Sequence, residues 1–416
     1  MPVEQIDTLV IGAGQSGIAM SEHLRDMKVP HLVLERKRVA ERWRSERWDS
    51  LVANGPAWHD RFPNLEFDDV QPDAFPPKER VAKYFEDYAR MIDAPIRTGV
   101  EVTNVKRCDN RPGFIVTTSD GVIEAKRVVA ATGPFQVPQF PAIIPADAGV
   151  RQLHSSAYKH PGQLDDGAVL VVGGGASGSQ IAEELRASGK TVYLSVGEHY
   201  RPPRSYRNRD YVWWLGVLGK WDEIKNKLKK KHVAFAVSGY DGGKTIDFRR
   251  LAHQGITVLG LTKGYERGVL HFENDLTANV AAGDEAYFDV LREADAYVER
   301  NGLDLPAEPD AWQLLDDPAC LTEPILRLDL AEAGIKTILW ATGFKFDFGW
   351  LQVDAFDEHG MPFHKRGISA ESGIYFLGLP ELTNRASSFI YGCWHDAKYL
   401  ADHIAIQRNY VAYEKD

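Results

Sequence analysis

The stretch VLVVGGGASGSQIAEELRASGKTVYLS, residues 169–195, contains an apolar run, a glycine cluster and a second apolar run. The run before Gly173 is typical of a parallel strand that is buried on both faces. Glycines at the spacing GxGxxG permit a tight turn, let a pyrophosphate approach the backbone and let the next helix pack closely. The stretch therefore predicts a strand, turn, helix and strand that bind a dinucleotide at the helix N-terminus.

The same pattern stands near the N-terminus, in TLVIGAGQSGIAMSEHLRDMKVPHLVLE, residues 8–35. Gly12, Gly14 and Gly17 repeat the spacing, and Glu35 ends the second apolar run. A carboxylate at this position accepts hydrogen bonds from the ribose hydroxyls of a dinucleotide. A lone GxGxxG is weak evidence, but here every part of the unit follows in order. Two copies predict two bound dinucleotides.

The two copies differ at their last residue, because Ser195 stands where the first copy has Glu35. A short neutral side chain leaves room for a 2′-phosphate, and Arg201 and Arg204 follow closely enough to bind it. We therefore expect FAD at the first copy and NADPH at the second. Arg207 and Arg209 are expected in a solvated loop.

The length of 416 residues favours two domains over a single core. Two strand-like segments that end in Ala-Thr-Gly, residues 127–135 and 337–344, bracket the second copy. We expect an α/β fold with two Rossmann-like dinucleotide-binding domains in a glutathione-reductase-like arrangement. The NADPH domain, residues 164–325, would be inserted into an FAD domain formed by residues 1–163 and 326–416.

Composition excludes several classes of function. The net charge of −10 argues against a nucleic-acid-binding surface, and the lysine-rich stretch at residues 225–231 is expected to be a solvated helix face. The three cysteines form no CxxC pair, which fits a reducing compartment. We expect a cytoplasmic protein with a small-molecule substrate as its partner, no metal, no nucleic acid and no membrane. A homodimer is left open as the assembly.

Four segments resemble the flavin-containing monooxygenases, and the resemblance covers almost the whole chain. They are RWRSERWDSLVANGP (residues 42–56), FPPKERVAKYFEDYA (75–89), QLHSSAYK (152–159) and the C-terminal segment 373–404. A second Ala-Thr-Gly, as at Ala341, is also found in that family. The segments AERW and HSSAYK are in addition similar to plant indole-3-pyruvate monooxygenases.

The resemblance implies that NADPH reduces FAD, that O2 is a second partner beside the substrate, and that a C4a-hydroperoxyflavin transfers one oxygen atom to a small organic substrate. N- or S-oxygenation, or oxidative decarboxylation of a 2-oxo acid, is implied, with Asn54 as the catalytic residue beside the flavin. Ala148 and Val150 depart from the family fingerprint, which has Phe and Gly there. Tyr158 stands where Baeyer–Villiger monooxygenases have Trp, so that reaction stays an alternative. His154 and Tyr158 are assigned a structural or gating role.

Two other classes stay open: a reductase that passes electrons from NAD(P)H to another acceptor, and a non-enzymatic regulatory flavoprotein. The residues expected to bind the cofactors are Gly12, Gly14, Gln15, Ser16, Gly17, Glu35, Arg36, Trp43, Thr132, Gly133, Gly173, Gly175, Ala176, Ser177, Gly178, Ser195, Arg201, Arg204, Thr342 and Gly343.

Overall fold

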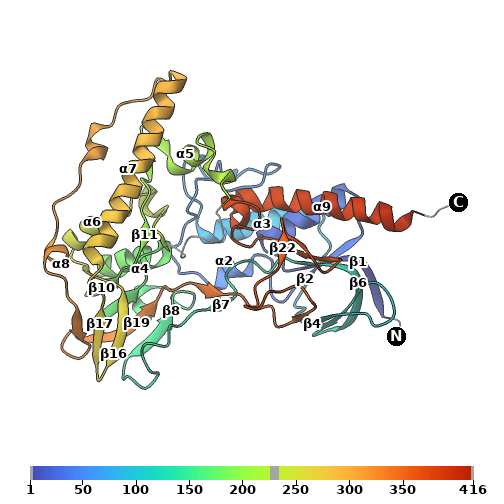
Figure 1. Cartoon of the computed structure of the whole chain (residues 1–416), viewed down its shortest axis with the longest axis horizontal. Helices are drawn as coiled ribbons and strands as arrows, with labels where there is room; N and C mark the ends of the chain where they lie inside the picture. Colours follow the sequence, from blue (N-terminus) through green and yellow to red (C-terminus); the bar gives the residue numbers. More distant parts are fainter. Residues whose placement is uncertain (1–2, 225–233, 414–416) are drawn as a thin grey trace.

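The computed structural model describes residues 3–224 and 234–413, so the lysine-rich stretch 225–231 lies outside the described residues. The elements form two lobes, each built on its own sheet (Figure 1). One lobe contains the first glycine copy and the C-terminal helix, and the other contains the second copy and the long helix α7. The predicted α/β class with parallel sheets is confirmed.

The first sheet has 10 strands, and its central strand β1 pairs in parallel with β2 and β6. Its main path runs in the order β21-β4-β5-β6-β1-β2-β3, with β22, β23 and β24 attached through β6. The strands are β1 (Glu4–Ile11), β2 (His31–Glu35), β3 (Ile96–Thr98), β4 (Val102–Arg107), β5 (Phe114–Thr118), β6 (Gly121–Ala130), β21 (Leu351–Gln352), β22 (His364–Lys365), β23 (Ile368–Ser369) and β24 (Ile374–Phe376).

The second sheet has 5 strands in the order β15-β10-β9-β19-β8, and every pair in it is parallel. Its strands are β8 (Arg151–His154), β9 (Ala168–Val172), β10 (Val192–Ser195), β15 (Thr257–Leu259) and β19 (Ile335–Trp340). An antiparallel sheet of β16 (Thr262–Glu266), β17 (Val269–Phe272) and β18 (Arg327–Asp329) belongs to the same lobe.

Strands β8 and β19 come from the segments 1–163 and 326–416, which we expected in the first domain. Strand β19 instead pairs with β9 on one side and β8 on the other. Strand pairing thus places both with the middle segment, whose expected bounds were residues 164 and 325. The short antiparallel pair β7 (Val137–Pro138) and β20 (Phe344–Lys345) lies where the chain passes between the two sheets.

Helices cover both sheets. Helix α1 follows β1 directly and packs against the C-terminal helix α9. Helix α4 likewise follows β9 directly, and it packs against β9 and β10. The helices are α1 (Gln15–Asp26), α2 (Glu41–Ser45), α3 (Lys78–Met91), α4 (Ala176–Ala187), α5 (Tyr211–Val217), α6 (Phe248–His253), α7 (Leu276–Asn301), α8 (Ala319–Thr322) and α9 (Ile390–Ala412). The remaining short strands are β11 (His199–Tyr200), β12 (Ser205–Tyr206), β13 (Arg209–Asp210) and β14 (Ala234–Phe235).

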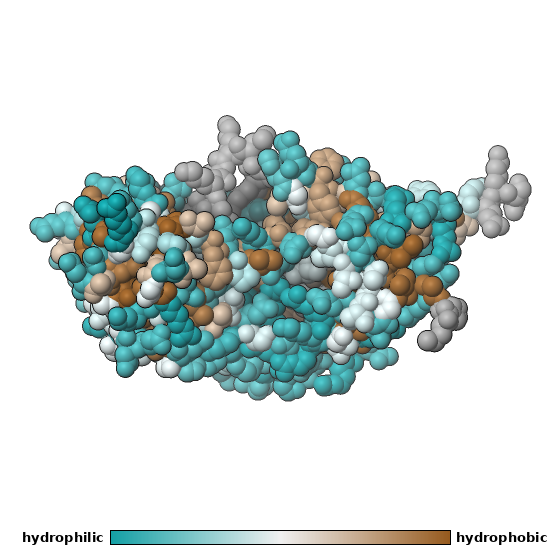
Figure 2. All heavy atoms as spheres, turned by 90° about the horizontal axis from the view of Figure 1, so that it is seen from below, coloured by the Kyte–Doolittle hydropathy of each residue, from teal (hydrophilic) through white to brown (hydrophobic). Residues whose placement is uncertain are grey.

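The face shown in Figure 2 is largely hydrophilic, with hydrophobic side chains in scattered groups among the polar ones. This surface agrees with a chain that carries a formal net charge of −10. Within residues 3–224 and 234–413, no helix has both the length and the apolar character needed to cross a bilayer.

Candidate cofactor and active site

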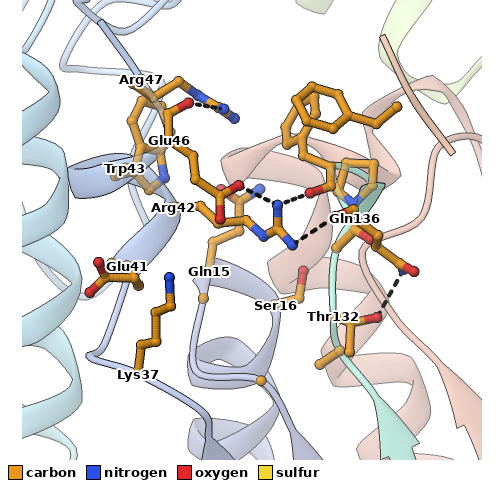
Figure 3. A pocket seen from close by; sticks show the side chains of 18 of the residues that line it. Gln15, Ser16, Lys37, Glu41, Arg42, Trp43, Glu46, Arg47, Thr132 and Gln136 are labelled. Atoms are coloured by element: carbon orange, nitrogen blue, oxygen red, sulfur yellow. Dashed lines mark hydrogen bonds and ion pairs between the residues drawn. The ribbon is translucent and has the colours of Figure 1, made fainter. Parts of the chain in front are cut away.

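A cavity of about 880 Å³ lies where the two lobes meet. Its walls come from both glycine copies, from the segment around α2, from the chain after β6 and from the start of α9. Figure 3 shows side chains from the first glycine copy, the segment around α2 and the chain after β6 pointing toward one another. A cavity of this size, lined by both apolar and charged side chains, is typical of a cofactor or substrate site.

The three glycines of the first copy have different structural roles. Gly12 has φ +107°, and a Cβ there would lie 2.7 Å from the Ala131 carbonyl oxygen. A Cβ on Gly17 would lie 1.8 Å from the Gly12 oxygen, so this glycine permits close packing of α1 on β1. Gly14 has no atom within 4 Å of the Cβ position and lines the cavity. The backbone at Gly14 is therefore open to an anionic group at the N-terminus of α1.

Glu35 ends β2 at the edge of the same cavity. Its Oε2 accepts a hydrogen bond from the Ala13 N–H at 2.9 Å, and its Oε1 accepts one from the Lys37 N–H at 2.9 Å. These two donors hold the carboxylate in place, and a carboxylate oxygen can accept further hydrogen bonds from a ribose. The predicted residues that line this part of the cavity are Gly12, Gly14, Gln15, Ser16, Glu35, Arg36, Trp43, Thr132 and Gly133.

The second glycine copy has the same local geometry. Gly173 has φ +120° with a Cβ position 2.5 Å from the Ala341 oxygen, and Gly178 repeats the 1.8 Å approach to the Gly173 oxygen. Gly175 precedes the first turn of α4, and Ala176 and Ser177 line the cavity. The N-termini of α1 and α4 therefore open into one shared cavity.

The structure does not bring Ser195, Arg201 and Arg204 to an open anion site. The Ser195 hydroxyl is buried, donates to the Gly260 oxygen at 2.8 Å and accepts from the Thr262 N–H at 3.1 Å. All three residues are at most 3% exposed, and none lines the cavity.

Both arginines are held by carboxylates inside the lobe. Arg201 forms ion pairs with Asp284 at 2.7 Å and Asp247 at 3.4 Å. Arg204 pairs with Asp210, whose pKa is raised by burial although the guanidinium opposes that rise. The expectation that these arginines bind a 2′-phosphate therefore lacks support, because their charges are already compensated.

Thr342 and Gly343 also lie away from the expected position. They follow β19 of the second sheet, and they do not line the cavity. The Thr342 hydroxyl donates to the Gln139 oxygen at 2.5 Å, and the Gly343 oxygen accepts from the Gln139 N–H at 3.0 Å. Thr342 and Gly343 therefore form hydrogen bonds between the two chain segments that connect the sheets, instead of facing a flavin.

His154 and Tyr158 make internal contacts at the same junction. His154 Nδ1 accepts from the Ser156 N–H at 3.1 Å, so Nε2 carries the proton and donates to the Gly343 oxygen at 3.0 Å. Burial lowers the pKa of His154, in agreement with a neutral ring. The buried Tyr158 hydroxyl donates to Glu184 Oε2 at 2.6 Å.

Asn54 lines the cavity together with Asp60 and Gln180. Its Oδ1 accepts from Gln180 Nε2 at 3.1 Å, and its backbone oxygen accepts from Arg204 Nη1 at 2.6 Å. Asp60 accepts from the Gly55 N–H at 3.0 Å and contacts His59 Nδ1 at 2.9 Å. The Asn54 turn is thus held by hydrogen bonds from both sides of the cavity.

Sequence analysis missed the charged and polar residues that flank Trp43 and Thr132. Arg42 pairs with Glu46 at 2.5 Å and donates to the Phe135 and Gln136 carbonyls (Figure 3). The Arg47 guanidinium lies 4.6 Å from the Phe135 ring centre, and burial lowers the pKa of Arg47 to about 10. Arg42, Glu46 and Arg47 lie inside the segment 42–56, and that position was the sequence signal that could have identified them as residues near the cavity.

Gln180 is a further residue that the sequence interpretation did not select. It lies two positions after Gly178 on α4, within the first turns of the predicted helix. Helix position alone would have placed it near the cavity, but its contact with Asn54 joins residues 126 positions apart.

A family model described as pyridine nucleotide-disulphide oxidoreductase matches residues 9–231. An uncharacterized CzcO-like oxidoreductase from Geobacillus kaustophilus is 31% identical over 403 residues, which cover 96% of this chain and 98% of that protein. A probable indole-3-pyruvate monooxygenase, YUCCA1 from Arabidopsis thaliana, is 33% identical over 193 residues, which cover 45% of this chain and 46% of that one. A flavin-containing monooxygenase from Stenotrophomonas maltophilia has a similar fold, with a TM-score of 0.68, 17% identity and coverage of 98% of this chain and 100% of that one.

Fold, cavity and comparisons together define an oxidoreductase. The chain belongs to the pyridine nucleotide-disulphide oxidoreductase family. Its predicted resemblance to the flavin-containing monooxygenases is confirmed by these relatives.

Proposed function

We propose that this chain is an FAD-dependent, NADPH-consuming monooxygenase that inserts one atom of O2 into a small organic substrate. The observation that carries the proposal is the single cavity into which the N-termini of α1 and α4 both open. Such a cavity lets a hydride donor bound at one helix reach a flavin bound at the other. The proposed domains are a discontinuous FAD domain around the first sheet and an inserted NADPH domain around the second.

The residues of the first lobe fit FAD. Gly14 leaves space for a pyrophosphate at the N-terminus of α1, and Glu35 is placed to accept hydrogen bonds from a ribose. Bound FAD would supply the redox chemistry, accepting reducing equivalents from NADPH and activating O2. The chain's own residues then bind, orient and exclude water.

Asn54 is the proposed catalytic residue. Its side-chain oxygen is engaged by Gln180, which leaves the amide N–H groups as hydrogen-bond donors on the cavity side. Trp43, Trp48 and Phe389 line the same cavity and restrict water. The proposed reaction is N- or S-oxygenation, or oxidative decarboxylation of a 2-oxo acid. The partial match to a probable indole-3-pyruvate monooxygenase supports keeping 2-oxo acids in the substrate range.

The test uses the purified holoenzyme with a panel of amines, thioethers, 2-oxo acids and cyclic ketones. We expect release of FAD on denaturation, oxygen uptake that depends on NADPH, and a product that carries one oxygen atom from labelled O2. Ester formation from a ketone would identify the Baeyer–Villiger alternative. NADPH oxidation that yields hydrogen peroxide alone with every substrate would overturn the monooxygenase assignment.

A reductase that acts on a disulphide is the second candidate, because the family name includes that activity. No cysteine is among the described residues that line the cavity, and Cys393 is buried with its pKa raised by burial. A redox step through a cysteine pair would need such residues beside the flavin. NADPH consumption without oxygen uptake, in the presence of a disulphide acceptor, would favour this candidate.

A further inference from the structure

Gln180 contacts two oxygen atoms at the wall of the cavity. Its Nε2 donates to the Val237 carbonyl oxygen at 2.8 Å and to Asn54 Oδ1 at 3.1 Å. Gln180 is buried, at 5% exposure, and lies on α4, whereas Asn54 belongs to the segment that precedes α3. The contact therefore connects the two lobes directly at the proposed catalytic residue.

The Val237 carbonyl decides the orientation of both amides. A carbonyl oxygen only accepts hydrogen bonds, so the Gln180 atom beside it must be the NH2 group. The same NH2 group faces Asn54, and the Asn54 atom that it contacts must therefore be the oxygen. The Asn54 Nδ2 is left without a hydrogen bond to any described residue, at the edge of the cavity.

Two further contacts hold the Asn54 backbone against the second lobe. Arg204 Nη1 donates to the Asn54 oxygen at 2.6 Å, and the Arg204 guanidinium lies 4.9 Å from the Phe75 ring centre. At Gly239 a Cβ would lie 2.2 Å from the Ala53 oxygen, so only glycine permits this close approach. The loop that carries Val237 is thus packed onto the backbone that carries Asn54.

We propose that Gln180 is a positioning residue that orients the Asn54 amide so that its N–H groups, and not its oxygen, face the cavity. Arg204 supports this role by holding the Asn54 backbone. This proposal rests on the proposed function of Asn54. It also gives Arg204 a role other than phosphate binding, and it connects the helix proposed to bind NADPH to the residue proposed to act beside the flavin.

The decisive variant is Gln180→Glu, which keeps the shape but replaces the NH2 donor by a carboxylate oxygen. A carboxylate facing Asn54 would favour the flipped amide, which presents Oδ1 to the cavity. Gln180→Met removes the donor without adding charge and covers the case in which the glutamate variant fails to fold. Gln254→Glu, at an exposed position of the same lobe, is the control for the added charge.

The measurement is a double-mutant cycle between Gln180→Glu and Asn54→Ala, read as hydrogen peroxide released per NADPH oxidised. We expect each single variant to raise the peroxide fraction several-fold, and the double variant to match Asn54→Ala alone. Gln254→Glu should equal the wild type. A further several-fold rise when Gln180→Glu is added to Asn54→Ala, or a wild-type peroxide fraction in Gln180→Glu, would overturn the positioning role.

Two readouts separate this proposal from the proposed function. The dissociation constant of NADP+, measured through the flavin absorbance, and a crystal structure of Gln180→Glu report on the Asn54 amide without turnover. We expect the effects of Gln180→Glu and Asn54→Ala on this dissociation constant to be non-additive. We expect the crystal structure of Gln180→Glu to show a flipped Asn54 amide. If the wild type makes no oxygenated product but these two results hold, the monooxygenase assignment fails and the positioning role stands. An unflipped amide with additive dissociation constants would contradict the positioning role.

Discussion

The two glycine copies are nearly identical as local structures, yet their surroundings differ. In both, the last glycine brings the helix onto the preceding turn, with Cβ positions 1.8 Å from a backbone oxygen at Gly17 and Gly178. The first copy ends at Glu35 on the cavity, whereas the second ends at Ser195, whose hydroxyl is buried against Gly260 and Thr262. The motif therefore determines the backbone cradle, and residues distant in sequence determine which side chains remain free for a ligand.

The largest expected effect separates cofactor binding at Gly14 from helix packing at Gly17 within the first copy. Gly14→Leu should abolish flavin retention, because its side chain would fill open space at the N-terminus of α1. The fold should survive, since the Cβ position at Gly14 meets no atom within 4 Å. Flavin absorbance and circular dichroism of the purified variant test both statements.

Gly17→Ala is the matched control for this variant. It should lower the melting temperature strongly, because the new methyl group would overlap a backbone oxygen. A Gly14→Leu protein that retains flavin at the wild-type level would show that the α1 N-terminus is not the pyrophosphate site.

The second prediction compares the last residues of the two copies. Glu35→Gln should weaken FAD binding by about 1.5 to 3 kcal/mol, the range for a hydrogen bond to a charged group. Ser195→Ala should leave the dissociation constant of NADP+ nearly unchanged, because the hydroxyl already forms hydrogen bonds with Gly260 and Thr262. Titration calorimetry with FAD and NADP+ measures both. A large loss of NADP+ affinity in Ser195→Ala would restore the expected contact with the ribose.

The third prediction concerns Arg204. Arg204→Ala should raise the KM for NADPH and for NADH by the same several-fold factor, since the guanidinium holds Asn54 and Asp210 instead of a 2′-phosphate. Steady-state kinetics with both cofactors gives the ratio. A loss confined to NADPH would return Arg204 to phosphate recognition.

The parts of the molecule that could be predicted from sequence are those made by neighbours along the chain. Each strand, glycine turn and helix lies within a single stretch of sequence, so periodicity and glycine spacing were sufficient to find Gly14 and Glu35. Strands β8 and β19 could not be assigned in this way, because their pairing joins residues about 190 positions apart, as in the contact of His154 with Gly343. Long-range pairing is set by packing of whole elements and leaves little local signal.

The same reason explains the errors at the candidate site. Arg201 looked free in the sequence because Asp247 and Asp284 stand far along the chain. Gln180 drew no attention because its partner Asn54 belongs to the other lobe. Side chains whose role depends on partners distant in the sequence are the ones that sequence reasoning misassigned or missed.

The smallest expected effect lies at the junction between the two lobes. His154 accepts a hydrogen bond at Nδ1 from the Ser156 N–H and donates from Nε2 to Gly343, so the folded protein requires the neutral ring. Burial lowers the pKa of His154 below its ordinary value of 6.5. As the pH falls through 6.5, His154 becomes protonated in the unfolded chain but stays neutral in the folded protein. The free energy of unfolding should therefore decrease until the lowered pKa is reached.

The measurement is urea unfolding of the wild type and of His154→Gln between about pH 7.5 and pH 5. The wild type should lose stability on acidification, and His154→Gln should lose less over the same range, although it is less stable at neutral pH. Other buried histidines with lowered pKa values, such as His23 and His199, contribute equally to both proteins and cancel in the difference. If the two proteins show parallel pH profiles, the junction tolerates a charged His154, and the contact with Gly343 is not what keeps the ring neutral.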